Sequence, residues 1–440
     1  MTDQRSPARR HRPWYRSAKI RKRIYAGLWG IAALLLVVFA FQASKAISAL
    51  RLASTQASVL QTQIAGGDVD GTKRTLAALQ DSTGVAHSNT DGLMWDLGSH
   101  IPFLGRNFDA VQTVSAVLDD VATNALPPIA AVAQKVNTKT FSPQGGKVDL
   151  AALESIEPSV GRADRALTRA RREISEIDDG GLFLPLKGPV RAVKQSIFTA
   201  QSASSAGHLA SQLLPTMLGG DGVKRRYMLL IQNNAETRST GGITGAFAIL
   251  TAKNGKLAMG QQGTVLDLKP ILKPVVKPTK GELEVFASSM FTDLRNVNFT
   301  PDFPRTGEIT AAMVKEGLGE DVDGVISVDP VALSYVLAGT GPVTLEDGTV
   351  LTEANAVPFL LNRVYVDNEN SPKRQDDIFA SAAREIFNVV KAGTGDARLV
   401  IGGLAQAALE NRLTVWSNHA DEQKRIAKSR VSGRLTSDEG

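Results

Sequence analysis

The sequence predicts an α+β protein in three parts: one membrane-spanning helix near the N-terminus, an all-α bundle or stalk, and an α/β sandwich domain. An uncharged apolar run covers residues 24–41, apolar residues recur at helical spacing from about 44 to 217, and strand-length apolar runs alternate with helical patterns over 225–395. The 440 residues are enough for two or three domains, and the 43% hydrophobic content is that of a globular protein.

The positive charge of the chain is concentrated at its N-terminus. Residues 1–23 hold nine basic side chains and one acidic side chain, a net charge of +8, while the whole chain carries +6, so the remainder carries −2. The sequence therefore does not predict a body that binds nucleic acid through its general charge. The chain has no cysteine, which excludes disulfides and thiol chemistry, and its five histidines form no pair at metal-ligand spacing.

Residues 24–43 are expected to form a transmembrane helix. The segment Ile24–Phe41 is long enough to cross a hydrocarbon core of roughly 30 Å, and Tyr25 and Trp29 lie towards its basic end, as interfacial aromatics do. A cleaved signal peptide is the alternative, but the apolar run is longer than the usual signal core and a helical pattern continues after it. The positive-inside rule predicts that the disordered tail 1–23 stays in the cytoplasm, so the body is extracytoplasmic and anchored to the plasma membrane by a single pass.

The region 44–218 is expected to be helical. The segments 101–107 and 184–190 each open a helix, and these two helices are expected to end near the prolines at 127–128 and at 215. Each is preceded by a further helical stretch, so the sequence indicates a repeated helical hairpin. A bundle that holds the next domain away from the membrane is one interpretation, and a coiled-coil partner surface is the other.

Glycines 219, 220 and 222 mark the boundary to an α/β domain at 225–395. Strand-length runs, an Asn-Gly turn and an Asp-Pro helix start indicate its elements. The expected elements are strands at 227–231, 246–251 and 256–259 with a turn at Asn254–Gly255, a strand at 324–328 before the N-cap Asp329, a hairpin turning at Asp347–Gly348, a helix capped by Thr352 and a last helix at about 375–391. Residues 396–440 are expected to be a separate helical and polar segment.

A polar, glycine-rich segment between the first two strands is the candidate ligand-binding loop. Its glycines allow close approach of the backbone to a ligand, and an arginine within it has the geometry to grip a phosphate or a carboxylate with two hydrogen bonds. The loop residues are Asn233, Asn234, Glu236, Arg238, Thr240, Gly241 and Gly242. The alternative is a hairpin connection whose polar side chains satisfy only its own backbone.

Two further loops carry both acidic and basic side chains in otherwise apolar surroundings. The first holds Asn298, Asp302 and Arg305, and the second holds Arg363, Asp367, Arg374 and Asp376. Arginine and aspartate in several loops suit a phosphate and its metal ion, but they suit solvated surface pairs equally well. The sequence has no phosphate-binding Walker loop, nucleophile elbow, zinc-protease motif or dinucleotide fingerprint.

Over about 225–395 the chain resembles the actinobacterial cell-envelope proteins catalogued as domain of unknown function 4012. The resemblance lies in YMLLIQNNAETRSTGGITGAFAIL, NVNFTPDFP and VDGVISVDPVALSYVLAGTGPV, and it extends to the N-terminal anchor and helical spacer. It implies no activity. Relatives often continue into a β-rich region, so the chain is interpreted as either a short member or an incomplete one.

A more distant resemblance is to the LytR-CpsA-Psr phosphotransferases, which move glycopolymers from a polyprenyl pyrophosphate carrier to the cell wall with Mg²⁺. Arg238-Ser239-Thr240 is similar to their Arg-Ser-Asp-Thr signature but lacks the Asp, and Asn296-Val297-Asn298, the strand of GVISVDPVAL, Arg363 and Arg374-Gln375 are similar to further elements. The resemblance implies a LytR-CpsA-Psr-like sandwich in which Arg238, Arg363 and Arg374 neutralise a pyrophosphate. Asn233, Glu236 or Asp302 would replace the missing Asp, and the metal ligands stay unknown.

Two functions follow as hypotheses. The first is an envelope protein whose α/β domain binds a cell-wall glycopolymer, a polyprenyl-pyrophosphate intermediate or a protein partner. The second is a Mg²⁺-dependent phosphotransferase with Arg238, Arg363, Arg374 and Asp302 as catalytic residues. No cofactor other than possible Mg²⁺ and no nucleic acid partner is expected. Convergence of the three arginines on one carboxylate beside an apolar cavity would favour the enzyme.

Overall fold

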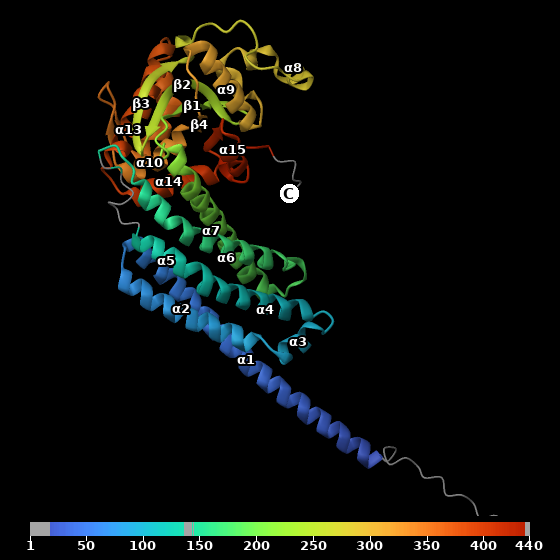
Figure 1. Cartoon of the computed structure of the whole chain (residues 1–440). Coiled ribbons are helices and arrows are strands. Elements are labelled where there is room, and N and C mark those ends of the chain that lie inside the picture. Colours follow the sequence, from blue (N-terminus) through green and yellow to red (C-terminus); the bar gives the residue numbers. More distant parts are fainter. Residues whose placement is uncertain (1–17, 136–142, 144, 436–440) are drawn as a thin grey trace, which may run out of the picture. The chain divides into compact units, whose positions relative to one another are not determined.

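The computed structural model describes residues 18–135, 143 and 145–435, and these form two compact units (Figure 1). The first unit combines the described residues up to Leu126 with Arg169–Ser196, and the second combines Pro127–Thr168 with the residues from Ile197 onward. The chain therefore crosses between the units at 126–127, 168–169 and 196–197, while glycines 219–222, the predicted domain boundary, lie inside the second unit. The basic segment up to residue 17 lies outside the described residues.

The first helix, α1 (Ala18–Gly66), contains the whole apolar run and continues beyond it without a break. Its segment Arg21–Ile64 is long and apolar enough to span a membrane. Side chains of the apolar run are exposed, whereas Ala46, Ala49, Ala53 and Leu60 are buried. The same helix thus changes from a lipid-compatible surface to a packed face within a few residues, which fits a single-pass anchor.

Helix α2 (Val69–Thr90) packs along that buried face of α1, and α4 (Gly105–Asp120) packs on α2. A small core of Ala53, Leu60, Leu79 and Ala122 joins α1 to its neighbours. The unit contains α2 (Val69–Thr90), α3 (Leu93–Ser99), α4 (Gly105–Asp120), a π-helical turn (Val121–Ala125), a 3₁₀ turn (Asp179–Gly181) and the adjoining parts of α6 (Leu150–Ser175) and α7 (Leu184–Met217). The predicted helical region is thus confirmed as helical.

The sequence suggested that a helix ends near the prolines at 127 and 128, but the structure shows that it does not. The π-helical turn at Val121–Ala125 precedes them, and the chain continues directly as α5 (Leu126–Lys135). A proline in the first turn of a helix removes no hydrogen bond, because the N–H groups there have no intrahelical partner. The π turn resets the helical register, so both prolines occupy such first-turn positions.

The second unit is built on a five-stranded sheet with the order β3-β2-β1-β4-β7 (Figure 1). The central pair β1–β4 is parallel and the other pairs are antiparallel. The strands are β1 (Arg225–Arg238), β2 (Gly241–Lys253), β3 (Lys256–Thr264), β4 (Gly324–Val328) and β7 (Leu413–Ser417), with a separate hairpin of β5 (Val343–Thr344) and β6 (Val350–Leu351).

Helices cover both faces of the sheet, as predicted for an α/β sandwich. Alternation along β1 sends Met228 and Leu230 to one face and Leu229 and Ile231 to the other, because successive strand side chains point in opposite directions. One face carries α9 (Phe303–Leu318) with the 3₁₀ turns Ser288–Phe291 and Leu294–Phe299, and α8 (Lys280–Phe286) adjoins it. The other carries α10 (Pro330–Thr340), α11 (Glu353–Pro358), the π turn Phe359–Arg363, α12 (Val364–Asp367) and α13 (Pro372–Ala392).

Local signals in the sequence locate several of these elements. Asn254 and Gly255 both have positive φ, +50° and +77°, as the tight turn between β2 and β3 requires. Asp329 caps α10 by accepting a hydrogen bond from the backbone of Ala332, and Thr352 caps α11.

The C-terminal segment belongs to the sheet domain, whereas the sequence analysis separated residues 396–440 from it. After α14 (Ala397–Leu409), strand β7 pairs with β4, and Trp416 packs into the core beneath α9. Gly307 of α9 makes room for the indole, since a Cβ there would lie 2.4 Å from Trp416 Cγ. The short α15 (Ala420–Ile426) follows.

We predict that Gly242→Ala destabilises the second unit by about 2–3 kcal/mol, because the new Cβ would lie 1.9 Å from the carbonyl oxygen of Asn233 and the hairpin would have to shift. Urea unfolding of the full chain in detergent measures the change. Gly402→Ala is the matched control: no atom lies within 4 Å of its Cβ position in α14, so stability should stay equal or rise by about 0.5–1 kcal/mol. Equal stabilities of the two variants would contradict the close approach.

Candidate functional site

A polar pocket of about 250 Å³ lies at the ends of strands β1, β4 and β7 of the five-stranded sheet. The carboxyl ends of β1 and β4 lie at this end of the sheet because the two strands are parallel, and the antiparallel β7 begins there. Ligands of open α/β sheets commonly bind outside the carboxyl ends of neighbouring parallel strands. The lining residues are Gln232, Asn234, Ser239, Thr240, Gly241, Ser327, Asp329, Glu410, Asn411, Arg412 and Thr414.

An irregularity in β1 directs the first wall residue into place. The β1–β2 register jumps between Asn233 and Thr237, which leaves three residues of β1 without partners on β2. Such bulges bend a strand and redirect its side chains. Asn234, the first bulged residue, donates from Nδ2 to Oδ2 of Asp329 over 2.7 Å.

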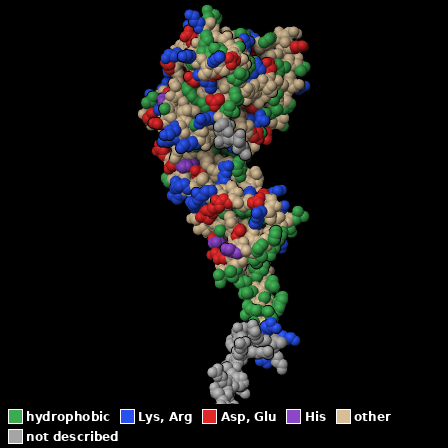
Figure 2. Space-filling view, turned by 90° about the vertical axis from the view of Figure 1, so that its right-hand side faces the viewer, with side chains coloured by type: hydrophobic (Ala, Val, Ile, Leu, Met, Phe, Trp, Pro, Cys, Tyr) green, Lys and Arg blue, Asp and Glu red, His purple; other side chains and the backbone are tan. Residues whose placement is uncertain are grey.

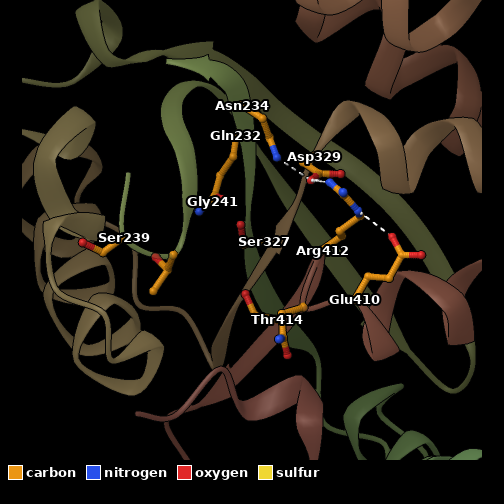
Figure 3. Close-up of a pocket in the computed structure, with 11 residues that line it drawn as sticks. Gln232, Asn234, Ser239, Gly241, Ser327, Asp329, Glu410, Arg412 and Thr414 are labelled. Carbon is orange, nitrogen blue, oxygen red and sulfur yellow. Dashed lines mark hydrogen bonds and ion pairs between the residues drawn. The ribbon is translucent and has the colours of Figure 1, made fainter. Parts of the chain in front are cut away.

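Asp329 is the buried centre of that wall and is only 3% exposed. Its Oδ2 accepts hydrogen bonds from Asn234 and, over 2.8 Å, from Nη1 of Arg412. Its Oδ1 accepts from the backbone N–H of Ala332 at the start of α10. One carboxylate therefore ties together β1, the segment before β7 and helix α10, as Figure 3 shows for its side-chain partners.

Arg412 also donates from Nε to Oε2 of Glu410 over 2.7 Å. That hydrogen bond, helped by Gln406 and Tyr335, holds the pKa of Glu410 below its ordinary value. Burial opposes the charge on Arg412, but Glu410 and Asp329 together outweigh burial and raise the arginine's pKa. The pocket's three charged side chains thus pair with one another, and their net charge is −1.

Several polar groups of the pocket have no hydrogen-bond partner among the described residues. Ser327 and Thr414 are paired residues of β4 and β7, both are nearly buried, and neither hydroxyl bonds to another described residue (Figure 3). Gln232 is 3% exposed, and its Nε2 has no hydrogen-bond partner in the described part of the chain. The same holds for Asn234 Oδ1 and Thr240 Oγ1. Buried polar atoms are seldom left unpaired, so these groups indicate that a ligand or ordered water completes the site.

One glycine of the predicted loop, Gly241, allows this packing. The loop is a hairpin with only Ser239 and Thr240 between its strands. Its backbone is therefore the hairpin connection that the sequence left open as the alternative to a ligand-binding loop. Gly241 has φ +126°, and a Cβ there would lie 1.9 Å from Oε1 of Gln232. A side chain at Gly241 would therefore displace a residue that lines the pocket.

The structure brings part of the predicted site together. Asn234, Thr240 and Gly241 line the pocket, while Asn233, Gly242 and Asn298 are buried and do not line it. Asn298 is fully buried and donates from Nδ2 to the carbonyl of Gly242 over 2.7 Å. The predicted glycine-rich segment and the 296–302 loop are thus neighbours.

The four residues predicted as catalytic do not line this pocket. Arg238 lies over the ring of Phe299, 5.2 Å from its centre, and donates to the carbonyl of Thr237. Asp302 accepts from the backbone N–H of Leu435. Arg363 ends the π turn before α12 and Arg374 lies in the first turn of α13, and both are exposed, as is Glu236 on β1.

The pocket does not suit Mg²⁺, which prefers oxygen ligands with free lone pairs and usually keeps several waters. Both oxygens of Asp329 and both oxygens of Glu410 already accept hydrogen bonds, two of them from Arg412. No group of three or more His, Asp or Glu side chains placed to hold a metal occurs among the described residues. We therefore derive no chemistry through a metal ion.

Glu410 and Arg412, which dominate the wall, were not predicted from the sequence, and Asp329 was predicted only as a helix cap. The Asp-Pro pair after the strand 324–328 was a usable signal for Asp329, because a carboxylate at the end of a parallel strand faces the binding edge of the sheet. Arg412 had no such signal, since its position depends on the pairing of β7 with β4.

The fold and the site define a sheet domain with a polar pocket whose charged side chains are paired, and this domain follows a helix long enough to span a membrane. Residues 222–365 match the family described as "Protein of unknown function (DUF4012)", so this part of the chain carries the domain of that family. The match includes β1–β4 and α10 but ends before β7, Glu410 and Arg412. No match to the chain is found among curated proteins.

A second titratable group, Asp376, lies above β2 near the hairpin. Its Oδ1 would lie 3.3 Å from a Cβ on Gly245, the extra residue of β2 opposite the register shift of β1. Burial raises the pKa of Asp376 from 3.8 to about 6, with smaller contributions from Asp377 and Asp267. The folded state therefore favours the protonated carboxyl.

We predict that Asp376→Asn stabilises the protein by about 1 kcal/mol at pH 7.5, a value reduced from the full shift because the side chain is partly solvated. The raised pKa means that Asp376 contributes stability below pH 3.8 and loses it as the pH rises through about 6. Unfolding midpoints between pH 4.5 and 7.5 should show the gain shrinking in acid. Asp367→Asn, which removes an exposed carboxylate, is the control, and a pH-independent gain at Asp376 would refute this assignment.

Proposed function

We propose that this protein is a membrane-anchored, extracytoplasmic envelope protein whose pocket binds a neutral, hydroxyl-rich ligand, namely a sugar unit of a cell-wall glycopolymer. The observation that carries the proposal is the set of unpartnered groups that line a pocket whose charges are already paired, namely the hydroxyls of Ser327 and Thr414 and the Nε2 of Gln232. Hydroxyl and amide groups both donate and accept, so they match sugar hydroxyls.

The charge balance favours a sugar over a pyrophosphate at this site. A pyrophosphate needs cations that are free to pair with it, whereas Arg412 is held by Asp329 and Glu410 on either side. The net charge of −1 among the lining residues would repel an anion. A neutral ligand has no such cost.

The pocket's size supports one sugar unit at a time. Its volume of about 250 Å³ lies below the roughly 300–1,000 Å³ typical of sites that enclose drug-sized ligands. A polymer would therefore present one residue to the pocket and continue outside it. We expect modest affinity for a single unit and higher avidity where several anchored copies share one polymer.

The phosphotransferase hypothesis depends on the resemblance of Arg238, Arg363 and Arg374-Gln375 to LytR-CpsA-Psr elements. These arginines lie on three different elements, and none lines the pocket. Binding without group transfer is therefore the function that the geometry supports best.

The proposed topology can be tested by cysteine labelling, since the chain has no cysteine of its own. We expect Leu272→Cys, at an exposed position of the second unit, to react with a membrane-impermeant maleimide on intact cells. Ser6→Cys in the basic segment should react only after the membrane is permeabilised. The reverse pattern would place the body in the cytoplasm and exclude a role at the cell wall.

We predict that Ser327→Ala combined with Thr414→Val weakens binding of neutral wall oligosaccharides about tenfold, because each lost hydrogen bond contributes about 0.5–1.5 kcal/mol. Titration calorimetry of the full chain in detergent, with oligosaccharides released from the cell wall by mild acid, measures the change. Thr251→Val is the matched control, since it makes the same substitution in β2 away from the pocket.

Farnesyl pyrophosphate is the competing probe. The proposal requires that it bind more weakly than the oligosaccharides and that Arg238→Ala leave oligosaccharide affinity unchanged. Tight binding of farnesyl pyrophosphate that Arg238→Ala abolishes, without oligosaccharide binding, would overturn the sugar assignment in favour of the phosphotransferase.

A further inference from the structure

The first unit exposes large apolar side chains on two segments of the chain, and we call this cluster the apolar tip. One part lies on and after α3, and the other lies at the start of α7. The members are Leu93, Leu97, Ile101, Phe103, Leu104, Phe183 and Leu184, of which Phe103 is 94% exposed, Leu184 84% and Leu93 74%. Exposed apolar groups that gather in one place mark an interaction surface.

The two parts of the apolar tip are held together by specific contacts. The backbone N–H of Phe183 donates to Oδ1 of Asn107 over 2.8 Å, and Arg106 pairs with Asp178 over 3.3 Å. Asn107 is buried in the first turn of α4, directly after the loop that carries Phe103. The surface is therefore a fixed feature of the first unit.

The backbone at Phe103 is strained in a way that exposes its ring. Its φ is +66°, a conformation that is an outlier for a bulky side chain. The turn is closed by hydrogen bonds from the N–H groups of Leu104 and Gly105 to the carbonyl of Ile101. Strained backbone that persists in a fixed turn is often associated with function.

The apolar tip adjoins the place where the apolar run of α1 ends. Phe39 of α1 contacts Trp95 of α3 and Phe108 of α4, with ring centres 5.1 and 5.2 Å apart, and the last two rings lie 5.4 Å from each other. Phe39 is two residues before Phe41, the last apolar residue of the run. Figure 2 shows hydrophobic side chains continuing from the exposed helix onto the adjoining end of this unit.

We propose that the apolar tip inserts into the lipid bilayer that α1 spans, to the depth of the boundary between headgroups and acyl chains. This inference rests on the anchor in the proposed function but does not depend on which side of the membrane the body occupies. Lipid is the occupant that fits because the surface is continuous with the lipid-compatible face of α1 through the Phe39 contacts. Exposed leucine and phenylalanine side chains gain free energy on leaving water at this depth.

Insertion would give the first unit a second attachment to the membrane. A single helix leaves the attached unit free to tilt and to rotate about the helix axis, whereas a second apolar contact on one side of the helix restricts both motions. The rigid contacts at Asn107 and Trp95 would transmit that restriction to α4 and α3.

Site-specific labelling of the full chain in proteoliposomes tests this inference. Single cysteines replace Phe103 or Leu184 in the apolar tip, Leu34 in the apolar run of α1, or Val85 on the exposed surface of α2 as the matched control in the same unit. Each carries the same environment-sensitive fluorophore, and the vesicles contain phosphatidylcholine and phosphatidylglycerol with spin-labelled acyl chains as quenchers.

We expect the labels at F103C and L184C to be quenched about half as strongly as the label at L34C, as insertion by roughly 5–10 Å predicts, and V85C to stay unquenched. A second experiment measures quenching of the label at L97C in the otherwise unchanged chain and in the chain that also carries F103D and L184D. The two aspartates would place charge in lipid, so we expect them to abolish the quenching at L97C. Quenching at L34C without quenching at F103C, L184C and L97C would overturn the inference while leaving the anchor intact. No quenching at L34C would instead refute the anchor.

Discussion

The second unit depends on one buried carboxylate. Asp329 accepts hydrogen bonds from Asn234 on the β1 bulge, from Arg412 before β7 and from the first turn of α10, so it joins three segments that are far apart in the sequence. Removing one partner of a buried charge pair commonly costs about 3–5 kcal/mol, because the remaining charge is left without compensation. The same contacts fix the wall of the pocket, which means that folding and site geometry share one set of interactions.

Much of the fold could be predicted from local patterns. The Asn254-Gly255 turn, the strand before Asp329 and the capping by Thr352 are each specified by neighbouring residues, and the structure confirms them. The helix through Pro127 and Pro128 could not be predicted, because it depends on a π turn that leaves no distinct signal in the sequence. The position of β7 in the sheet could not be predicted either. Its five residues form a strand only because they pair with β4 and because Trp416 packs against α9.

The candidate site, like the fold, could be predicted from the sequence only in part. The glycine-rich segment of β1 and β2 was recognisable because close backbone approach requires glycine, and it supplies Asn234, Thr240 and Gly241 to the pocket. The arginine that matters for the pocket was missed, because Arg412 is brought to Asp329 by a strand pairing across 83 positions of sequence. Arg238, in contrast, has a conspicuous sequence context but lies over Phe299.

The continuity of α1 has a mechanical consequence. Only a few residues separate the end of the apolar run at Phe41 from Ala46, the first residue of the buried face, and all of them are helical. A helix of 49 residues at 1.5 Å per residue is a stiff rod about 70 Å long, so it acts as a lever rather than as a tether. In the proposed membrane-anchored state, a change in bilayer thickness would alter the tilt of α1 and with it the orientation of the helices packed on α1.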